Sequence, residues 1–494
     1  MKRILKFSAP LLLLIVTMAG CKKEWLNTNP SNQVTPDVIF KDTEGAQVAL
    51  DGAYRLYYSF FTNHGNFGPK SYDIVADLMG NDMVVHSQGY GWFNTDYRYT
   101  AQMSAADNSR SDVMWGYYYK IISNANNIIN NIEAAGGPQE DKERIEGEAR
   151  GIRADCYYRL INWFQQTYKG NESAPGVPIY TETTTIGNPR GTVQDVYNLI
   201  IDDLTQAETL LTGKTRAHIS NINVNTVQGL RARVALTMED WGTAATYANK
   251  ARQGRSPMNA GQYTQGFSKM TDGNPEWIWG FEVITDQATI YASFYSHMDV
   301  EMGGYAALGG QKKITKALYD QIPVGDVRKL VWTAPGSGGD ENPDYNQTKF
   351  HAPVPGNWAA DYLMMRAAEM YLIEAEALAR QGGGSEAQAI TVLEQLIQAR
   401  NPAYTAGGFS GVSLINEILL QRRIELWGEG FGIHDIKRLK TGLNRPTGPD
   451  NHGLPNYDPI IYTLPDGDPR FLMRIPQDEL DANVNMTNAD QNPS

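Results

Sequence analysis

The chain has 494 residues, of which 41% are hydrophobic, enough apolar material for one large core or two smaller ones. Its formal net charge of −12 at pH 7 argues against a nucleic-acid-binding protein and disfavours strongly anionic ligands.

Residues 1–20 are typical of a secretory signal peptide. The positive charges of Lys2, Arg3 and Lys6 precede the apolar run 11–16, which is too short to span a bilayer. Removal of this segment takes away three positive charges and no acids, so the net charge changes from −12 to −15.

The segment Met18-Ala19-Gly20-Cys21 is similar to the cleavage motif of bacterial lipoproteins, in which the cysteine receives lipid. An ordinary signal peptide with an incidental cysteine is the alternative. We expect a lipid on Cys21 to tether the mature chain to a membrane without spanning it. Cys156, the other cysteine of the chain, then has no disulfide partner.

After a polar tether at 21–41, apolar residues recur at the three- and four-residue steps of a helix. The expected helices cover residues 43–61, 111–135, 140–168, 193–211, 223–239 and 240–253. Thr43 is the expected N-cap of the first helix. Cys156 falls on the apolar stripe of 140–168, so we expect a buried thiol rather than a reactive one.

Residues 361–440 predict three more helices. Gly382-Gly383-Gly384 ends the first, and Ser385 with Gln388 forms a capping-box pattern at the start of the second. The third opens near Ser413. Their alanines favour close helix pairs of the tetratricopeptide kind, and we expect Leu372 and Leu393 to face the core.

Two long segments, 62–110 and 255–360, show no sustained helical period, although 277–283 is strand-like. A stretch of this length without regular structure is typical of a functional cap. The sequence therefore predicts a mainly α body at 42–494. Its tetratricopeptide-like scaffold comprises 42–61, 111–254 and 361–440, and the irregular segments lie over it.

The charged run of the last predicted helix could be an acid/base cluster, but buried charges in a helical scaffold are more often structural ion pairs. Its members are Arg422, Glu425, Glu429, Asp435 and Arg438. The seven histidines form no metal-ligand pattern, and no phosphate loop or nucleophile elbow is present, so we expect no catalytic residue, metal or cofactor. His86, His297 and His351 fall in loops, where solvation or support of a neighbour is expected.

The loop 89–97 is the most informative stretch for binding. Exposed rings offer flat apolar faces with few torsions to immobilise, and Asn or Asp can bind hydroxyl groups. The candidates for ligand contact are Tyr90, Trp92, Phe93, Asn94 and Tyr97, with Asp96 as a further polar group. The alternative is that these aromatics cover the helical core. Asp77, Asn81 and Asp82 precede the loop and are expected to cap helix ends rather than contact a ligand.

Five segments, in order, resemble the SusD-like (RagB/SusD) family of outer-membrane nutrient-binding lipoproteins. They are Cys21-Lys22-Lys23-Glu24-Trp25-Leu26-Asn27; Gly147-Glu148-Ala149-Arg150 with Arg153-Ala154 and Tyr157-Tyr158; the helix at 366–377; Arg422-Arg423-Ile424-Glu425-Leu426 with Glu429-Gly430 and Asp435-Ile436-Lys437-Arg438; and the C-terminal 475–493.

This resemblance implies a cell-surface position and a SusC-like TonB-dependent transporter as partner. It also implies that ligand groups come from the loop 89–97 and from the later irregular segment, where Tyr291, Tyr295 and Tyr305 are of the matching type. We therefore expect a non-enzymatic lipoprotein of the outer membrane that captures an oligosaccharide or similar nutrient. The alternatives are a lipid-anchored glycoside hydrolase, which needs two facing carboxylates, and a tetratricopeptide scaffold that binds a protein.

Overall fold

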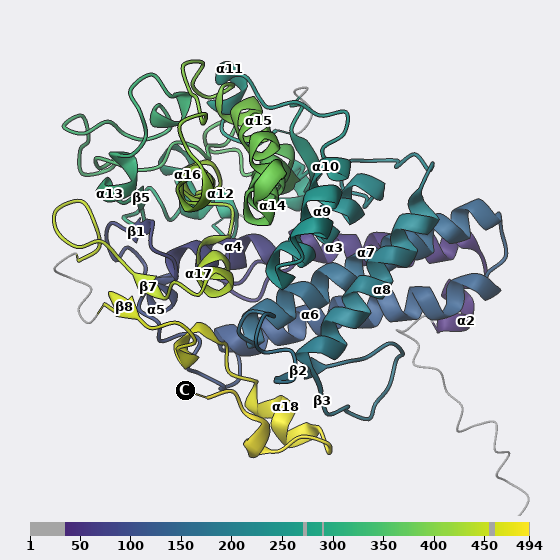
Figure 1. Ribbon diagram of the computed structural model, residues 1–494. Coiled ribbons are helices and arrows are strands. Elements are labelled where there is room, and N and C mark those ends of the chain that lie inside the picture. The colour runs from purple at the N-terminus through teal and green to yellow at the C-terminus, as the bar shows by residue number, and fades with distance from the viewer. Residues whose placement is uncertain (1–34, 270–273, 289–290, 454–459, 494) are drawn as a thin grey trace, which may run out of the picture.

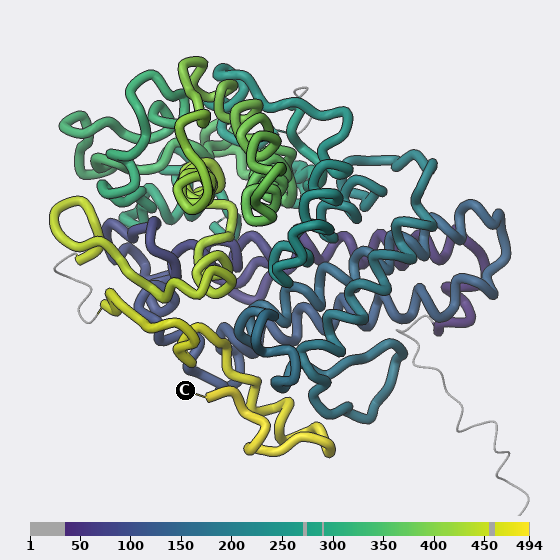
Figure 2. Tube along the Cα trace, viewed as in Figure 1, coloured from purple at the N-terminus to yellow at the C-terminus, as the bar shows by residue number. Residues whose placement is uncertain are grey.

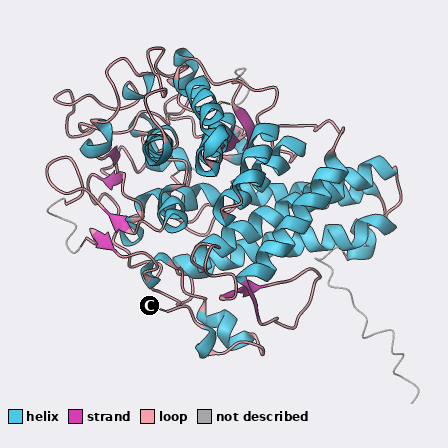
Figure 3. Ribbon diagram, in the orientation of Figure 1, coloured by secondary structure: helices cyan, strands magenta, loops and turns pink. Residues whose placement is uncertain are grey.

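The computed structural model describes residues 35–269, 274–288, 291–453 and 460–493, and helices dominate these ranges (Figures 1 and 3). The longer helices are α3 (Thr43–Ser59), α4 (Pro69–Leu78), α6 (Arg110–Asn131), α7 (Gln139–Phe164), α8 (Val193–Leu211), α9 (Val224–Met238), α10 (Trp241–Ala251), α14 (Ala367–Gln381), α15 (Glu386–Ile397), α16 (Gly411–Glu425) and α17 (Gly432–Leu439). The short ones are α2 (Pro36–Ile39), α5 (Asn94–Tyr97), α11 (Ala260–Tyr263), α12 (Phe294–Met298), α13 (Lys316–Tyr319) and α18 (Gln477–Ala482).

The described strands form four separate antiparallel pairs rather than one sheet. These are β1 (Met83–Val85) with β5 (Lys312–Ile314), β2 (Pro175–Pro178) with β3 (Arg190–Thr192), β4 (Trp277–Phe281) with β6 (Tyr362–Arg366), and β7 (Leu443–Asn444) with β8 (Thr463–Leu464). Short 3₁₀ turns occupy Ile132–Ala134, Thr285–Gln287, Val300–Met302, Val327–Lys329, Gly383–Ser385, Pro469–Phe471 and Asn488–Asp490. The pairs β1–β5 and β4–β6 each join segments that are far apart in the sequence.

The long helices build a scaffold of successive pairs. Helix α3 packs against α6 and α7, then α7 against α8, α9 against α10, and α14 against α10, α15 and α16. Figures 1 and 2 show these helices side by side, with the irregular teal and green segments at the upper left. The predicted mainly α, tetratricopeptide-like scaffold is confirmed.

Helix α14 is the centre of this scaffold, because every residue from Ala367 to Ala379 is buried. Its three carboxylates are each bound by an arginine from another helix: Glu369 by Arg233, Glu374 by Arg252 and Glu376 by Arg438. A buried carboxylate without such a partner would cost several kcal/mol, so these pairs are a condition for the packing. Leu372 and Leu393 are fully buried, as expected.

Several predicted boundaries were wrong for local reasons. Asp42, not Thr43, caps α3, because its side chain accepts from the Gly45 N–H. Ser385 makes no capping bond, since it ends a 3₁₀ turn that runs directly into α15. Residues 362–366 form strand β6 rather than the start of a helix.

The predicted last helix is two helices, α16 and α17. Gly428 and Gly430 lie between them with φ of +81° and +89°, a left-handed conformation that ends a right-handed helix. A side chain at Gly430 would also meet Asp73, since an added Cβ would lie 2.6 Å from its Oδ1. Glycine at this position therefore separates the helices and lets α17 approach α4.

Helix α4 lies in the segment 62–110, where the sequence shows no sustained helical period. It escaped prediction because it spans only ten residues, although Lys70, Asp73 and Asp77 recur at helical steps along it. Gly68 before Pro69 is the one start signal, since proline suits the first helical position.

Buried lysines close the C-terminal ends of two scaffold helices. Lys437 donates to the carbonyls of Asn162 and Gln165 at the end of α7, and Lys349 donates to those of Glu425 and Trp427 at the end of α16. A cation there satisfies free carbonyls and the negative end of the helix dipole. Burial lowers the pKa of Lys437 to about 7 and that of Lys349 to about 8.

Candidate ligand-binding site

Four of the predicted contact residues form one aromatic cluster. The ring centroid of Tyr305 lies 5.4 Å from that of Tyr90, 5.9 Å from Trp92 and 5.7 Å from Tyr291. Tyr90 is 69% exposed and Tyr291 40% exposed, whereas Trp92 and Tyr305 are half-buried. The structure therefore brings residues of the loop 89–97 and of the later irregular segment together.

The other four predicted contact residues are buried. Phe93 packs edge-on against His297, with ring centroids 4.8 Å apart, and Asn94 donates to the Gln88 carbonyl. The Tyr97 hydroxyl bonds to the His452 ring, and the Tyr295 hydroxyl to the Phe267 and Asp361 carbonyls. Direct ligand contact does not fit this burial, so Phe93, Asn94, Tyr97 and Tyr295 support the loops from within.

Three further rings, which the sequence did not single out, extend the cluster. Trp358 lies 5.3 Å from Tyr291, His64 lies 5.5 Å from Trp92, and the exposed Phe61 lies 5.7 Å from His64. We call the set Phe61, His64, Tyr90, Trp92, Tyr291, Tyr305 and Trp358 the aromatic surface. Two of these rings could have been found from the sequence. Phe61 stands beside a predicted helix end, and Trp358 follows a glycine turn.

The buried side chain of His297 contacts both Tyr305 and the segment that contains His64, and so joins two parts of the aromatic surface. Its buried imidazole stacks on Tyr305, with centroids 4.9 Å apart, and on Phe67 at 5.6 Å. Its Nε2 atom lies 2.7 Å from the His64 carbonyl, to which it donates. Burial and nearby cations hold the pKa of His297 well below 6.5, which keeps the imidazole neutral.

Arg110 joins the segment 62–68 to helix α5. Its guanidinium binds both carboxylate oxygens of Asp96, at 2.9 and 2.8 Å, and also donates to the Gly65 carbonyl and the Asn66 side chain. Asp96 is fully buried in this ion pair. Asp96 therefore has a structural role, rather than the predicted one of binding a ligand hydroxyl group.

The backbone also joins the two ligand-facing segments. The His86 N–H donates to the Gln311 carbonyl at 3.0 Å, which extends the β1–β5 pairing towards Tyr90. Beyond it, Gly89 has φ of +48°, and an added Cβ would lie 3.0 Å from the Gly310 nitrogen. Glycine is therefore required for this close approach.

The predicted helix-capping residues lie away from the aromatic surface. Asp77 accepts from the N–H groups of Gly430 and Gly432, and thereby caps the start of α17. Asp82 forms an ion pair with Arg423, and Asn81 accepts from the Asn444 N–H.

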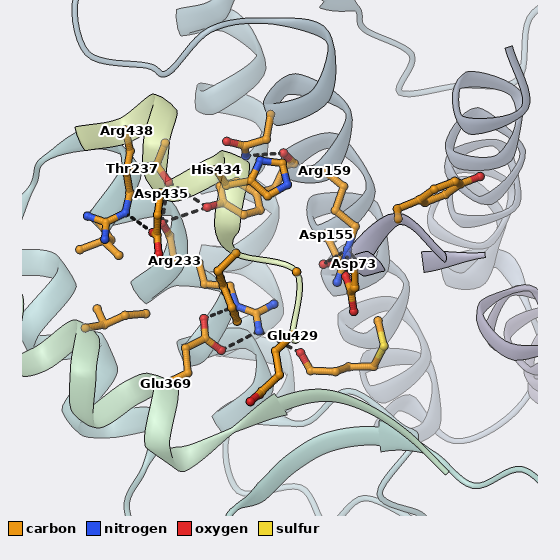
Figure 4. A pocket seen from close by; sticks show the side chains of 18 of the residues that line it. Asp73, Asp155, Arg159, Arg233, Thr237, Glu369, Glu429, His434, Asp435 and Arg438 are labelled. Atoms are coloured by element: carbon orange, nitrogen blue, oxygen red, sulfur yellow. Dashed lines mark hydrogen bonds and ion pairs between the residues drawn. The ribbon is translucent and has the colours of Figure 1, made fainter. Parts of the chain in front are cut away.

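The charged run forms structural ion pairs around an internal cavity of about 80 Å³ (Figure 4). Asp435 binds Arg422 and Arg438, at 2.7 and 2.6 Å, while Glu429 binds Lys349 and Arg366, both at 2.7 Å. These cations lower the pKa of Asp435, and they bring that of Glu429 to about 2. The interpretation as structural pairs is confirmed by these contacts.

Two features of the described residues bear on metals and membranes. No group of three or more His, Cys, Asp or Glu side chains is placed there to hold a metal ion. No helix in those same ranges has the length and apolarity needed to cross a membrane. Residues 1–34, including Cys21, lie outside them, so the predicted lipid anchor stays a prediction.

The chain was compared with known families and structures. Residues 46–236 match a family described as "Starch-binding associating with outer membrane", and residues 342–494 match the SusD family. SusD-like protein P2 of Formosa agariphila is 25% identical, over 97% of this chain and 98% of its own length.

Solved structures share the fold. A SusD-like carbohydrate binding protein from Bacteroides vulgatus is 28% identical, with a TM-score of 0.81 over 92% of this chain and 99% of that one. A SusD superfamily protein from Bacteroides thetaiotaomicron, 24% identical, has a TM-score of 0.77 over 92% of this chain and 100% of its own. The sequence matches and the common helical architecture show that this chain belongs to the SusD-like family.

Proposed function

We propose that this protein is a lipid-anchored glycan-binding protein of the outer membrane, which captures an oligosaccharide and passes it to a SusC-like TonB-dependent transporter. The observation that carries the proposal is the aromatic surface. Rings from three separate segments converge there, and Tyr90, Tyr291 and Phe61 expose large parts of their faces.

The chemistry of the surface suits a sugar. The C–H face of a pyranose packs on an aromatic ring, which offers apolar area and has few torsions to immobilise on binding. The Trp92 Nε1 and His64 Nδ1 atoms have no hydrogen-bond partner among the described residues. A ligand hydroxyl or a bridging water that reached these atoms would satisfy them.

The family supports the chemical class and the location. One matching family is described as starch-binding and associated with the outer membrane, and the Bacteroides vulgatus relative is called a carbohydrate binding protein. Transfer to the transporter rests on the family resemblance, and anchoring rests on the lipoprotein motif at Cys21. The carboxylates of the charged run are held in ion pairs, which supports capture without bond cleavage.

The test is calorimetric titration of the mature protein with neutral oligosaccharides, including malto-, xylo- and galactoheptaose. Trp92→Ala removes one stacking ring, so we expect about tenfold weaker binding with a nearly unchanged melting temperature. Trp241→Ala is the matched control, because Trp241 is a half-buried tryptophan on α10 that packs on Arg380 instead.

Unchanged affinity with a sharply lowered melting temperature in Trp92→Ala would make Trp92 a structural residue. Absence of binding by the wild-type protein to every saccharide of the panel would contradict glycan capture itself.

A further inference from the structure

A groove that includes no ring of the aromatic surface lies beside strand β1. The groove, of about 860 Å³, opens between β1, α13, α16, α17 and β7, and Met83 at the start of β1 lines it. Figure 1 shows these elements gathered on the left side of the molecule. Pockets that hold small ligands measure roughly 300–1,000 Å³, so this groove has the volume of a binding site.

Two ion pairs line the groove, and within each pair the two charges neutralise one another. Arg423 binds both carboxylate oxygens of Asp82, at 2.9 and 2.6 Å. The Arg422 Nε atom binds Asp435 at 2.7 Å. An ionic ligand would have to compete with these bonds.

The two remaining charged groups of the lining, Asp77 and Glu417, are occupied by neutral donors. The Asp77 oxygens accept from two backbone N–H groups at 3.0 and 2.8 Å. One oxygen of Glu417 accepts from the Tyr404 hydroxyl at 2.9 Å and from the Gln421 amide at 2.7 Å. Hydrogen bonds from neutral donors do not cancel the negative charge of a carboxylate, so the groove disfavours an anionic ligand.

Several polar groups of the lining remain free. The Asn416 and Asn444 side chains are exposed and form no hydrogen bond among the described residues. The Nη1 atom of Arg422, a side chain only 3% exposed, likewise has no partner in those residues. Half-buried Phe409, Leu420 and Phe431 supply apolar walls between these groups.

Apolar walls, free amides and carboxylate oxygens are complementary to a neutral molecule rich in hydroxyl groups, because amides both donate and accept and carboxylates accept from hydroxyl groups. We propose that the groove is a second binding site for a neutral oligosaccharide, distinct from the aromatic surface. The proposal takes its ligand class from the proposed function and adds a second point of attachment.

Two sites on one chain would favour a long glycan over a short one. A glycan long enough to occupy both sites binds the second one intramolecularly, which raises the overall affinity without new contacts. A polysaccharide should therefore bind more tightly than a heptaose of the same linkage.

The test uses two substitutions on α16, one turn apart. Asn416→Arg places a long charged side chain in the groove, at an exposed position without internal hydrogen bonds. Val412→Arg is the matched control, because Val412 is 73% exposed and does not line the groove. Both are compared with wild type, Trp92→Ala and the Trp92→Ala/Asn416→Arg double variant.

Calorimetry with the heptaose that binds, and with its parent polysaccharide, gives the readout. We expect two heptaose sites in wild type and in Val412→Arg, and one in Asn416→Arg. The heptaose binding left in Trp92→Ala should disappear in the double variant, and polysaccharide affinity should fall at least tenfold in Asn416→Arg.

The outcomes separate the two proposals. A single site that Trp92→Ala weakens and Asn416→Arg leaves unchanged overturns the groove and keeps the aromatic surface. A single site that only Asn416→Arg removes supports the groove and overturns the aromatic surface. Failure of the whole saccharide panel to bind wild type overturns both.

Discussion

The neutral imidazole of His297 touches residues from three segments of the chain: Phe67, Phe93 and Tyr305. Its single hydrogen bond to the His64 carbonyl fixes the ring edge. Ring stacking and hydrogen bonding can be separated experimentally, because phenylalanine keeps a flat ring of similar size and removes the donor.

We expect His297→Phe to leave the His64 carbonyl without its donor, which destabilises the protein by about 1–3 kcal/mol and weakens glycan binding. Denaturant unfolding and calorimetric titration measure the two effects. His297→Ala, which also loses the ring, should be worse in both measurements. Wild-type behaviour of His297→Phe would show that the hydrogen bond contributes nothing, and equal losses in the two variants would show that the ring contributes nothing.

Leu372 and Leu393 test the scaffold assignment at single residues. Both are fully buried in the core, so replacement by alanine should destabilise by about 2–5 kcal/mol through lost burial and the cavity left behind. The exposed Val412 serves as the control, since Val412→Ala should change stability by less than about 0.5 kcal/mol. A shift that small for either leucine in the denaturant midpoint would contradict the packing.

Sequence reasoning pointed to segments that the structure brings together, but it could not distinguish exposed rings from buried ones. Tyr90 and Tyr97 are the same residue type in one loop, yet Tyr90 is exposed and Tyr97 is buried. The difference arises because Tyr97 meets His452 and Arg445, which are remote in the sequence and provide a hydrogen bond and a cation over the ring. Burial of a tyrosine thus depends on partners that local pattern cannot reveal.

At the scale of helices and strands, prediction succeeded where one face is polar. The apolar stripe at 193–211 matches the bounds of α8, which has a buried face and an exposed one. Strand β6 was missed because all its side chains are buried, so no alternation marks its period. Helix α4 was missed because its ten residues give too few turns to establish a period within a Gly- and Asn-rich segment.

The cap of α3 provides a direct test of an element boundary. Asp42→Ala removes the acceptor of the Gly45 N–H, and we expect a loss of about 0.5–2 kcal/mol in the free energy of unfolding. Ser385→Ala is the contrasting variant, because Ser385 makes no capping bond at α15. Equal losses in urea titrations of the two variants would refute this assignment of caps.

The irregular segments and the scaffold are joined by a buried network of charges. Arg366 binds Glu276 from the irregular segment at 2.8 Å, and Glu425 and Glu429 from the region of α16 at 2.8 and 2.7 Å. Arg400 bonds to both Glu276 and Glu425. Removal of either part would leave several charges unpaired in the interior, so we expect the whole molecule to unfold as one unit.

This network gives stability a defined pH dependence. Neighbouring cations lower the pKa of Glu425 and bring that of Glu429 to about 2, below the ordinary value of 4.5. Stabilisation from a depressed carboxyl pKa is complete above the unfolded pKa and is lost as the pH falls through the folded one. The free energy of unfolding should therefore decrease between about pH 4.5 and pH 2.

Glu429→Gln should be less stable than wild type at pH 7, by about 3–5 kcal/mol, because Lys349 and Arg366 lose a charged partner. Its stability should also decline less steeply below pH 4.5. Urea unfolding at a series of pH values measures both effects. Parallel pH curves for the two proteins would mean that Glu429 keeps its ordinary pKa in the fold.

Anchoring is a property of the whole protein. If Cys21 carries lipid, Cys21→Ser should move the protein from the membrane fraction to the soluble fraction while the folded body keeps its melting temperature. Fractionation in cells with and without the transporter separates lipid anchoring from retention by a partner. A variant that stays in the membrane without the transporter would refute the lipid anchor.

The residues that hold the loops of the aromatic surface in place are not its exposed rings. Arg110, His297 and the β1–β5 pairing hold the loops in place, while Tyr90 contacts one ring, that of Tyr305, and otherwise faces solvent. An exchange at such a position leaves the core packing intact, so its effect on stability is small. Natural variation can therefore replace these rings one at a time and adapt the protein to a new glycan, without a compensating change in the helices.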